Sequence, residues 1–261
     1  MVLNRTINFI NKYHYVIFLL VRKQMLLRYR RTKLGFVWTI LNPLLMMTVL
    51  AFVFSAIMSI PLKDYALFFF SGMIVWNYIN YSINIASNCL IENEALINKI
   101  YLPKEIFPLS ISIALLIDAI LSFFPFFIIM IFLGAEVNLS SISILFAYFL
   151  IFIFVTGLSF LVSVATVFFR DLAYIIPIFL QALFFLTPIL YPVSRLEGNL
   201  VAILFNYNPI SPYINLVREP ITNGQFCTIE EYLIAISLSA TSFVIGLYFL
   251  NKNKTKIIHY L

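Results

Sequence analysis

The sequence predicts an all-α integral membrane protein with six transmembrane helices, an N-terminal cytoplasmic interface helix and an outer re-entrant helical hairpin. Of its 261 residues, 62% are hydrophobic and only 11% are charged, whereas a soluble domain carries about 25% charged residues. The mean hydropathy of +1.00 places the chain among membrane proteins. Apolar runs recur along its whole length, so residues 1–261 are interpreted as a single transmembrane domain.

Six apolar segments are long enough to cross a bilayer, whose hydrocarbon core of about 30 Å requires about 20 helical residues. An unbroken helix over 142–191 would be far too long, so Arg170 and Asp171 are placed in a turn between two spans. The predicted spans are residues 36–60, 65–90, 107–133, 142–169, 172–191 and 232–250.

The distribution of positive charge orients these spans. Fourteen of the 17 Lys and Arg residues lie before the first span, between the second and third, between the fourth and fifth, or after the last. Cytoplasmic loops carry such an excess of positive charge. We therefore expect a multi-pass protein of the cytoplasmic (inner) membrane with both termini in the cytoplasm.

A basic and partly apolar segment, residues 11–33, precedes the first span and is predicted to form the interface helix. It ends in the dense cationic run "RYRRTK", which contains Arg28, Arg30, Arg31 and Lys33. The planar guanidinium of Arg suits it to phosphate groups. The alternative is a topology anchor attracted to anionic lipid, worth about 1 kcal/mol per cation.

Polar side chains recur at helical spacing inside several spans, and those of the second span share one face. Such stripes favour a wettable pathway, and aromatic rings among them could stack on sugar rings. The alternative is that they hydrogen-bond the helices together, at about 0.6 kcal/mol each. Asp118, within the third span, is a further functional candidate without an assigned role. The predicted channel-lining residues are Asn77, Asn80, Tyr81, Asn84, Thr156, Ser159, Ser163, Tyr174 and Gln181.

The cytoplasmic loop at 92–105 is predicted to contain a helix that docks a partner protein. Its apolar residues, among them Ile97, Ile100 and Tyr101, would be costly to expose to cytosol unless covered. A solvated loop without a partner is the alternative. The candidate coupling residues are Glu92, Glu94, Asn98, Lys99, Tyr101, Lys104 and Glu105.

The outer segment 193–220 contains apolar runs too short to cross the membrane, separated by prolines. This pattern favours a re-entrant hairpin in the outer leaflet, because irregular backbone is tolerated there only inside protein or beside water. A loop resting on the lipid is the alternative.

Several chemistries are disfavoured by what the sequence lacks. Its seven glycines form no G-x-x-x-x-G-K-[ST] phosphate loop. Two histidines near the termini and two separate cysteines provide no metal-ligand spacing. We therefore expect no metal site and no enzyme activity, and any energy for transport is expected from a partner.

Four stretches together resemble the permease subunit of ABC exporters for polysaccharides and polyol phosphates, and are most similar to O-antigen export permeases. They are "RYRRTKLGFVWTILNPLLMMTVLAFVFS", "NCLIENEALINKIYLPKEIFPLS", "VFFRDLAYIIPIFLQALFFLTPILYP" and "YNPISPYINLVREPI". They occur in the expected order over nearly the whole chain.

This resemblance implies a homodimer in which each protomer binds a separately encoded ATPase subunit. ATP and Mg²⁺ would then be cofactors of that subunit, with none bound by this chain and no role for nucleic acid. Residues 92–105 would be the coupling helix. The cargo would be a glycan carried on undecaprenyl pyrophosphate.

The resemblance also assigns candidate sites. Leu34-Gly35 match the loop that joins interface helix and first span, and would complete a lipid-pyrophosphate site with the four cations before them. Arg170 and Asp171 match a cytoplasmic gate. The outer gate would lie in 193–220. Its candidate residues are Asn208, Pro209 and Arg218.

Other functions remain open from the sequence. An ABC exporter could instead carry a teichoic-acid-type polyol phosphate or a small amphiphile. A membrane enzyme acting on lipid-linked sugars would need a catalytic group near an interface. An ion channel or secondary transporter would use Asp118 and the asparagine stripe as its ion path.

Overall fold

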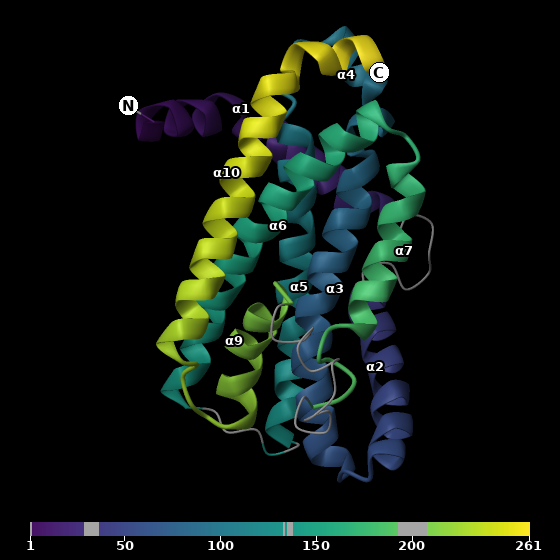
Figure 1. Cartoon of the computed structure of the whole chain (residues 1–261), viewed down its shortest axis with the longest axis vertical. Coiled ribbons are helices and arrows are strands. Elements are labelled where there is room, and N and C mark those ends of the chain that lie inside the picture. Colours follow the sequence, from purple (N-terminus) through teal and green to yellow (C-terminus); the bar gives the residue numbers. More distant parts are fainter. Residues whose placement is uncertain (1, 29–36, 133, 135–137, 193–207) are drawn as a thin grey trace.

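A computed structural model describes residues 2–28, 37–132, 134, 138–192 and 208–261. Within these residues every regular element is a helix, which confirms the all-α prediction. Figure 1 shows a long bundle with the α2–α3 turn at one end and α4 and the C-terminus at the other. The elements are α1 (Val2–Arg28), α2 (Val37–Met58), α3 (Leu62–Glu92), α4 (Glu94–Lys99), α5 (Ile106–Phe132), η1 (Leu139–Ile142), α6 (Ser143–Phe168), α7 (Leu172–Phe185), α9 (Ser211–Thr222) and α10 (Ile229–Tyr260).

Three helical stretches are long and apolar enough to cross a membrane: Ile106–Phe132, Leu139–Phe168 and Ile229–Tyr260. Two shorter apolar helices, Leu44–Met58 and Leu172–Phe185, accompany them in the described part of the chain. These features are those of a multi-pass membrane protein. The central helix α3 is long, but its asparagines keep its hydropathy below that of the three long apolar stretches.

Four predicted boundaries differ clearly from the structure. Helix α1 begins at Val2 rather than at residue 11. Helix α7 ends at Phe185 rather than at residue 191. Just after this end, the Thr187 hydroxyl donates to the Leu183 carbonyl, and Pro188 follows. Helix α10 continues past 250 to Tyr260, so the polar tail stays helical. The coupling segment 92–105 is not one helix, because the backbone becomes extended at Ile100, shortly before Pro103.

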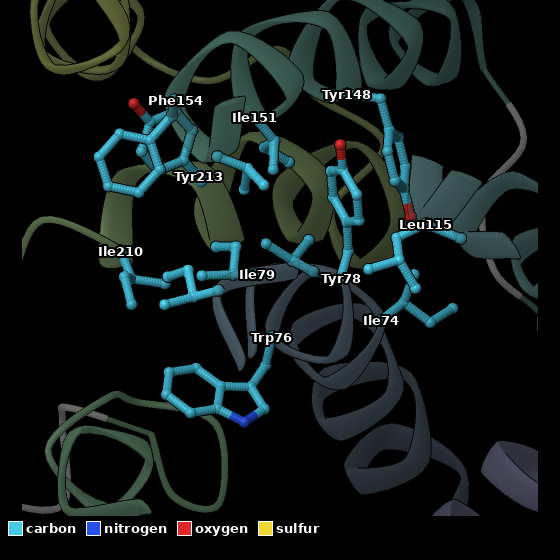
Figure 2. Packing of buried hydrophobic residues seen from close by; sticks show 14 of the residues in the cluster. Ile74, Trp76, Tyr78, Ile79, Leu115, Tyr148, Ile151, Phe154, Ile210 and Tyr213 are labelled. Atoms are coloured by element: carbon cyan, nitrogen blue, oxygen red, sulfur yellow. The ribbon is translucent and has the colours of Figure 1, made fainter. Parts of the chain in front are cut away.

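Helix α3 lies at the centre of the bundle and is buried along most of its length. Figure 2 shows side chains of α3 meeting those of α6 and α9, where the rings of Phe154 and Tyr213 pack with centroids 4.8 Å apart. The buried hydroxyl of Tyr78 donates to the Ser112 carbonyl of α5. Trp76 points away from this cluster and packs against Phe184 of α7 instead.

Helices α6 and α10 cross in backbone contact at two glycines. A Cβ atom on Gly246 would lie 2.0 Å from the Gly157 carbonyl oxygen, so only hydrogen fits there. Ser239 and Ser242 of α10 donate to the carbonyls of Leu150 and Phe154 across the same crossing. Small residues and hydroxyls of this kind let membrane helices approach closely without a hydrophobic driving force between them.

Candidate functional site

The loop between α3 and α5 is anchored by buried side chains on one side and exposes side chains on the other. Ile97 and Leu102 are buried and anchor α4 and the segment after it. Asn93, at the α3–α4 junction, accepts a hydrogen bond from Lys23 of α1 at 3.0 Å and donates to the Cys89 carbonyl. Helix α1 is therefore tied directly to the start of the loop.

The predicted coupling residues divide into two groups. Glu92, Asn98, Lys99 and Tyr101 are exposed, and Tyr101 is the most open at 89% of its surface. Glu94 is intermediate. Lys104 is buried, with its ammonium 5.5 Å from the Tyr101 ring centroid, and Glu105 forms an ion pair with Lys254. The exposed residues therefore form a surface of the loop, and Lys104 and Glu105 attach the loop to the rest of the bundle.

The predicted lipid-pyrophosphate site lies outside the described residues, apart from Arg28, the last residue of α1. Arg30, Arg31, Lys33, Leu34 and Gly35 all belong to the undescribed segment 29–36.

A cavity of about 220 Å³ lies close to the end of α1, and Asp118 is buried against it. Its lining residues are Gln24, Met25, Ile85, Ile111, Ala114, Leu115 and Asp118.

The predicted channel-lining residues of α3 and α7 retain access to the outside of the chain. Tyr81 and Gln181 are exposed, and Tyr174 is 77% exposed. Asn77, Asn80 and Asn84 are half-buried. The amide of Asn84 donates to both the backbone and the side-chain oxygen of Asn80, so two of the stripe residues support each other.

The corresponding residues of α6 lie between helices instead. Thr156, Ser159 and Ser163 are buried, and the hydroxyls of Thr156 and Ser163 donate to carbonyls of their own helix. Ser159 accepts a hydrogen bond from Ser112 of α5 at 3.4 Å. The Ser159 hydroxyl thus joins two helices, as in the alternative interpretation of the polar stripe, whereas the cited hydrogen bonds of Thr156 and Ser163 lie within α6.

The two predicted gates lie at opposite ends of the bundle. Arg170 and Asp171 are exposed in the α6–α7 turn, where Asp171 is the N-cap residue of α7. Pro209 is exposed near the start of α9 at the other end. Arg218 of α9 is buried there, with its guanidinium 3.8 Å from the ring centroid of Phe68.

Asn208 and Arg218 both donate hydrogen bonds to the segment that follows α7. Asn208 donates to the Leu186 carbonyl at 3.0 Å and to the Thr187 hydroxyl at 2.8 Å. Arg218 donates to the Pro188 carbonyl at 2.9 Å. A helix that has ended exposes carbonyl groups, and these side chains satisfy them.

Sequence reasoning missed two residues that contribute to this cluster around the segment after α7. The hydroxyl of Tyr65 donates to the Leu190 carbonyl at 2.7 Å, from the first turn of α3. Gly72 leaves room for Arg218, since a Cβ there would lie 2.8 Å from the guanidinium. Neither residue has a sequence signal, because both contacts join helices far apart in the chain.

Comparisons with known proteins match this architecture to one family. Residues 15–221 fit the family model described as "ABC-2 type transporter". The chain is 27% identical over 249 residues to an O-antigen export system permease protein RfbA of Klebsiella pneumoniae, covering 93% of each chain. It is 26% identical over 193 residues to the protein of the same name from Myxococcus xanthus, covering 74% of each.

The family match covers most of the chain and decides between a transporter subunit and the other classes of protein that the sequence left open. Its members are transporter membrane subunits rather than catalytic enzymes. The interpretations as a membrane enzyme, an ion channel or a secondary transporter are therefore set aside. The chain belongs to the ABC-2 type transporter family, as a permease similar to O-antigen export permeases.

Proposed function

We propose that this chain is the channel-forming subunit of an ATP-driven exporter that moves an undecaprenyl-pyrophosphate-linked, O-antigen-like polysaccharide across the cytoplasmic membrane. Two copies would assemble with two separately encoded ATPase subunits, which would bind the ATP and Mg²⁺. The observation that carries this proposal is the family membership together with relatives that bear an O-antigen export name over 93% of both chains.

The proposed topology keeps six spans with both termini in the cytoplasm, residues 11–33 on the inner surface and 193–220 as a re-entrant outer segment. Helix α3 has 31 residues and at 1.5 Å per residue is about 46 Å long. Helix α2 has 22 residues and is about 33 Å long. Both lengths suffice for a core of about 30 Å, which supports counting them as spans beside the three long apolar stretches. Helix α7 has 14 residues and is about 21 Å long, so the sixth span is proposed from the apolar run 172–191 rather than from the length of this helix.

The proposed glycan path follows the accessible face of α3 and α7, where a second protomer would complete the channel. Exposed Tyr81 and Tyr174 offer ring faces for stacking on sugars, and Asn77, Asn84 and Gln181 offer amides for hydroxyl groups. The buried hydroxyls of α6 are left out of this path.

The proposed coupling element is the exposed part of the α3–α5 loop. Ile100 and Tyr101 project from it with 52% and 89% of their surfaces exposed. Apolar surface at a cytoplasmic end, beyond the reach of lipid tails, is expected to be covered by a partner. A groove on the ATPase subunit would provide that cover.

Lipid-head capture is assigned to the cations from Arg28 to Lys33, and it can be tested without disturbing the loop. The variant Arg30→Ala/Arg31→Ala is expected to lower export of lipid-linked glycan at least about tenfold, since charge-assisted hydrogen bonds contribute about 1.5–3 kcal/mol each. Membrane insertion and association with the ATPase should be unchanged. Normal export by this variant would disprove the assigned role.

The matched control is Lys12→Ala/Arg22→Ala, which removes two exposed cations from the same helix α1. It should export normally if position matters rather than net charge. Chemical analysis of the lipid-linked material that accumulates when the gene is deleted identifies the cargo. Accumulation of a polyol phosphate instead of an undecaprenyl-linked glycan would replace the proposed substrate while leaving the transporter assignment intact.

A further inference from the structure

The C-terminal end of α10 folds across the end of the bundle that carries α4 instead of projecting from it (Figure 1). Leu250, Asn253 and Ile257 are buried at three- and four-residue spacing, so one face of this segment packs on the bundle. The ring of Tyr260 lies edge-on to Phe168 of α6, with centroids 5.0 Å apart. These contacts give the segment a defined position.

An ion pair joins this segment to the loop that carries α4. Lys254 contacts one carboxylate oxygen of Glu105, which lies directly before α5. The Glu105 side chain is only 12% exposed, and its other oxygen has no hydrogen-bond partner among the described residues. A partly desolvated pair of this kind is screened less by salt than a surface pair. It therefore holds the two segments side by side.

The opposite face of the segment is open and basic. Lys252 and Lys256 are exposed, and the nearby loop adds exposed Lys99, Ile100 and Tyr101. Figure 1 shows α4 and the end of α10 farther along the bundle than α1, the predicted interface helix. On the proposed topology, with α1 on the inner membrane surface, this position would lie in the cytosol beyond the lipid, which favours a soluble protein over a membrane as the occupant.

We propose that residues 252–260 of α10 and the α4 loop form one composite docking surface for the partner ATPase, with the lysines facing an acidic patch on that subunit. This inference rests on the proposed function and adds a second contact to the coupling loop. The Lys254–Glu105 pair keeps the two parts in register. Apolar contact by Tyr101 and charge contact by Lys252 and Lys256 would then act together.

The test measures binding of the ATPase subunit that co-purifies with the wild-type chain to the full-length chain in lipid nanodiscs. Lys252→Glu/Lys256→Glu is expected to raise the Kd about tenfold and to flatten its dependence on salt, because it replaces attraction by repulsion. The matched control Lys12→Glu/Arg22→Glu makes the same charge change on α1 and should stay within about twofold.

The ion pair is tested separately by exchange. Lys254→Glu alone should weaken ATPase binding, and Lys254→Glu with Glu105→Lys should restore most of it, since the pair is re-formed with opposite polarity. A merely local packing role of Lys254 would not be rescued by the second substitution, and failure of rescue would overturn the registering role of the pair.

The outcomes separate this inference from the function on which it rests. Unchanged affinity of the Lys252→Glu/Lys256→Glu variant, with weakened binding by Tyr101→Ala, would overturn the composite surface and leave the exporter intact. An effect seen only in nanodiscs of anionic lipid, and absent in neutral lipid, would assign the lysines to the membrane and also overturn it. A wild-type chain that captures no ATPase would instead refute the proposed function.

Discussion

Substitution of Gly246 by Ala tests the tightest contact in the bundle. The added Cβ would lie 2.0 Å from the Gly157 carbonyl oxygen and 2.8 Å from its carbon, where an ordinary contact begins at 3.4 Å. Both atoms are backbone, so neither helix can relieve the clash by a rotamer change. Helices α6 and α10 must separate along this seam.

The cost follows from what that separation loses. Overpacking in a tight core costs about 1–3 kcal/mol, and the Ser239 and Ser242 hydrogen bonds across the seam add about 0.6 kcal/mol each. We therefore expect Gly246→Ala to lower the free energy of unfolding by about 2–4 kcal/mol. Gly157→Ala should behave similarly, since its Cβ would lie 2.4 Å from backbone atoms of α10.

The assay is reversible unfolding of the purified chain in mixed detergent micelles, followed by tryptophan fluorescence. The control is Ile245→Ala, which alters an exposed neighbour in the same turn of α10 and should be close to neutral. Because both glycines meet in one contact, the double variant should lose less than the sum of the single losses. A Gly246→Ala protein as stable as the wild type would refute the close crossing.

Two further predictions concern the end of the bundle that carries α9 (Figure 1). Arg218→Ala should lower the free energy of unfolding by about 2–3 kcal/mol, because it removes the hydrogen bond to Pro188 and the stacking on Phe68. Arg218→Lys should recover only part of this loss. An unchanged midpoint of thermal unfolding for Arg218→Ala would contradict the structural role. Burial raises the pKa of the Cys227 thiol, which also donates to the Asn215 carbonyl. At neutral pH this cysteine is therefore protonated, and in a chain lacking the other cysteine it should react with maleimide at least about tenfold more slowly than after unfolding. Equal rates before and after unfolding would contradict the burial.

Much of the fold could be predicted because membrane insertion leaves a direct trace in the sequence. The apolar runs that became α5, α6 and α10 follow from the length that a helix needs to cross a bilayer. Helix α7 ends earlier than predicted, at Phe185, shortly before Pro188. The polar tail after Leu250 shows the limit, because hydropathy could not indicate that it remains helical and folds back.

The candidate sites were less predictable, since polar residues at the same helical spacing can either line an accessible face or pack between helices. Asn84 and Ser163 both belong to helical polar stripes, yet Asn84 lies on an accessible face and Ser163 is buried. Periodicity places residues on a common face of a helix. It does not say whether that face meets another helix, lipid or a second protomer.

The sequence by itself determined that the chain is a helical membrane protein, because hydrophobic length and composition act locally along each segment. The sequence also indicated the family, through motifs that occur in the expected order along the chain. Only the tertiary structure decided that Arg218 holds Pro188, that Tyr65 holds Leu190 and that Lys254 pairs with Glu105. Each of these contacts joins residues far apart in sequence, and their meeting depends on how the helices pack rather than on any local preference.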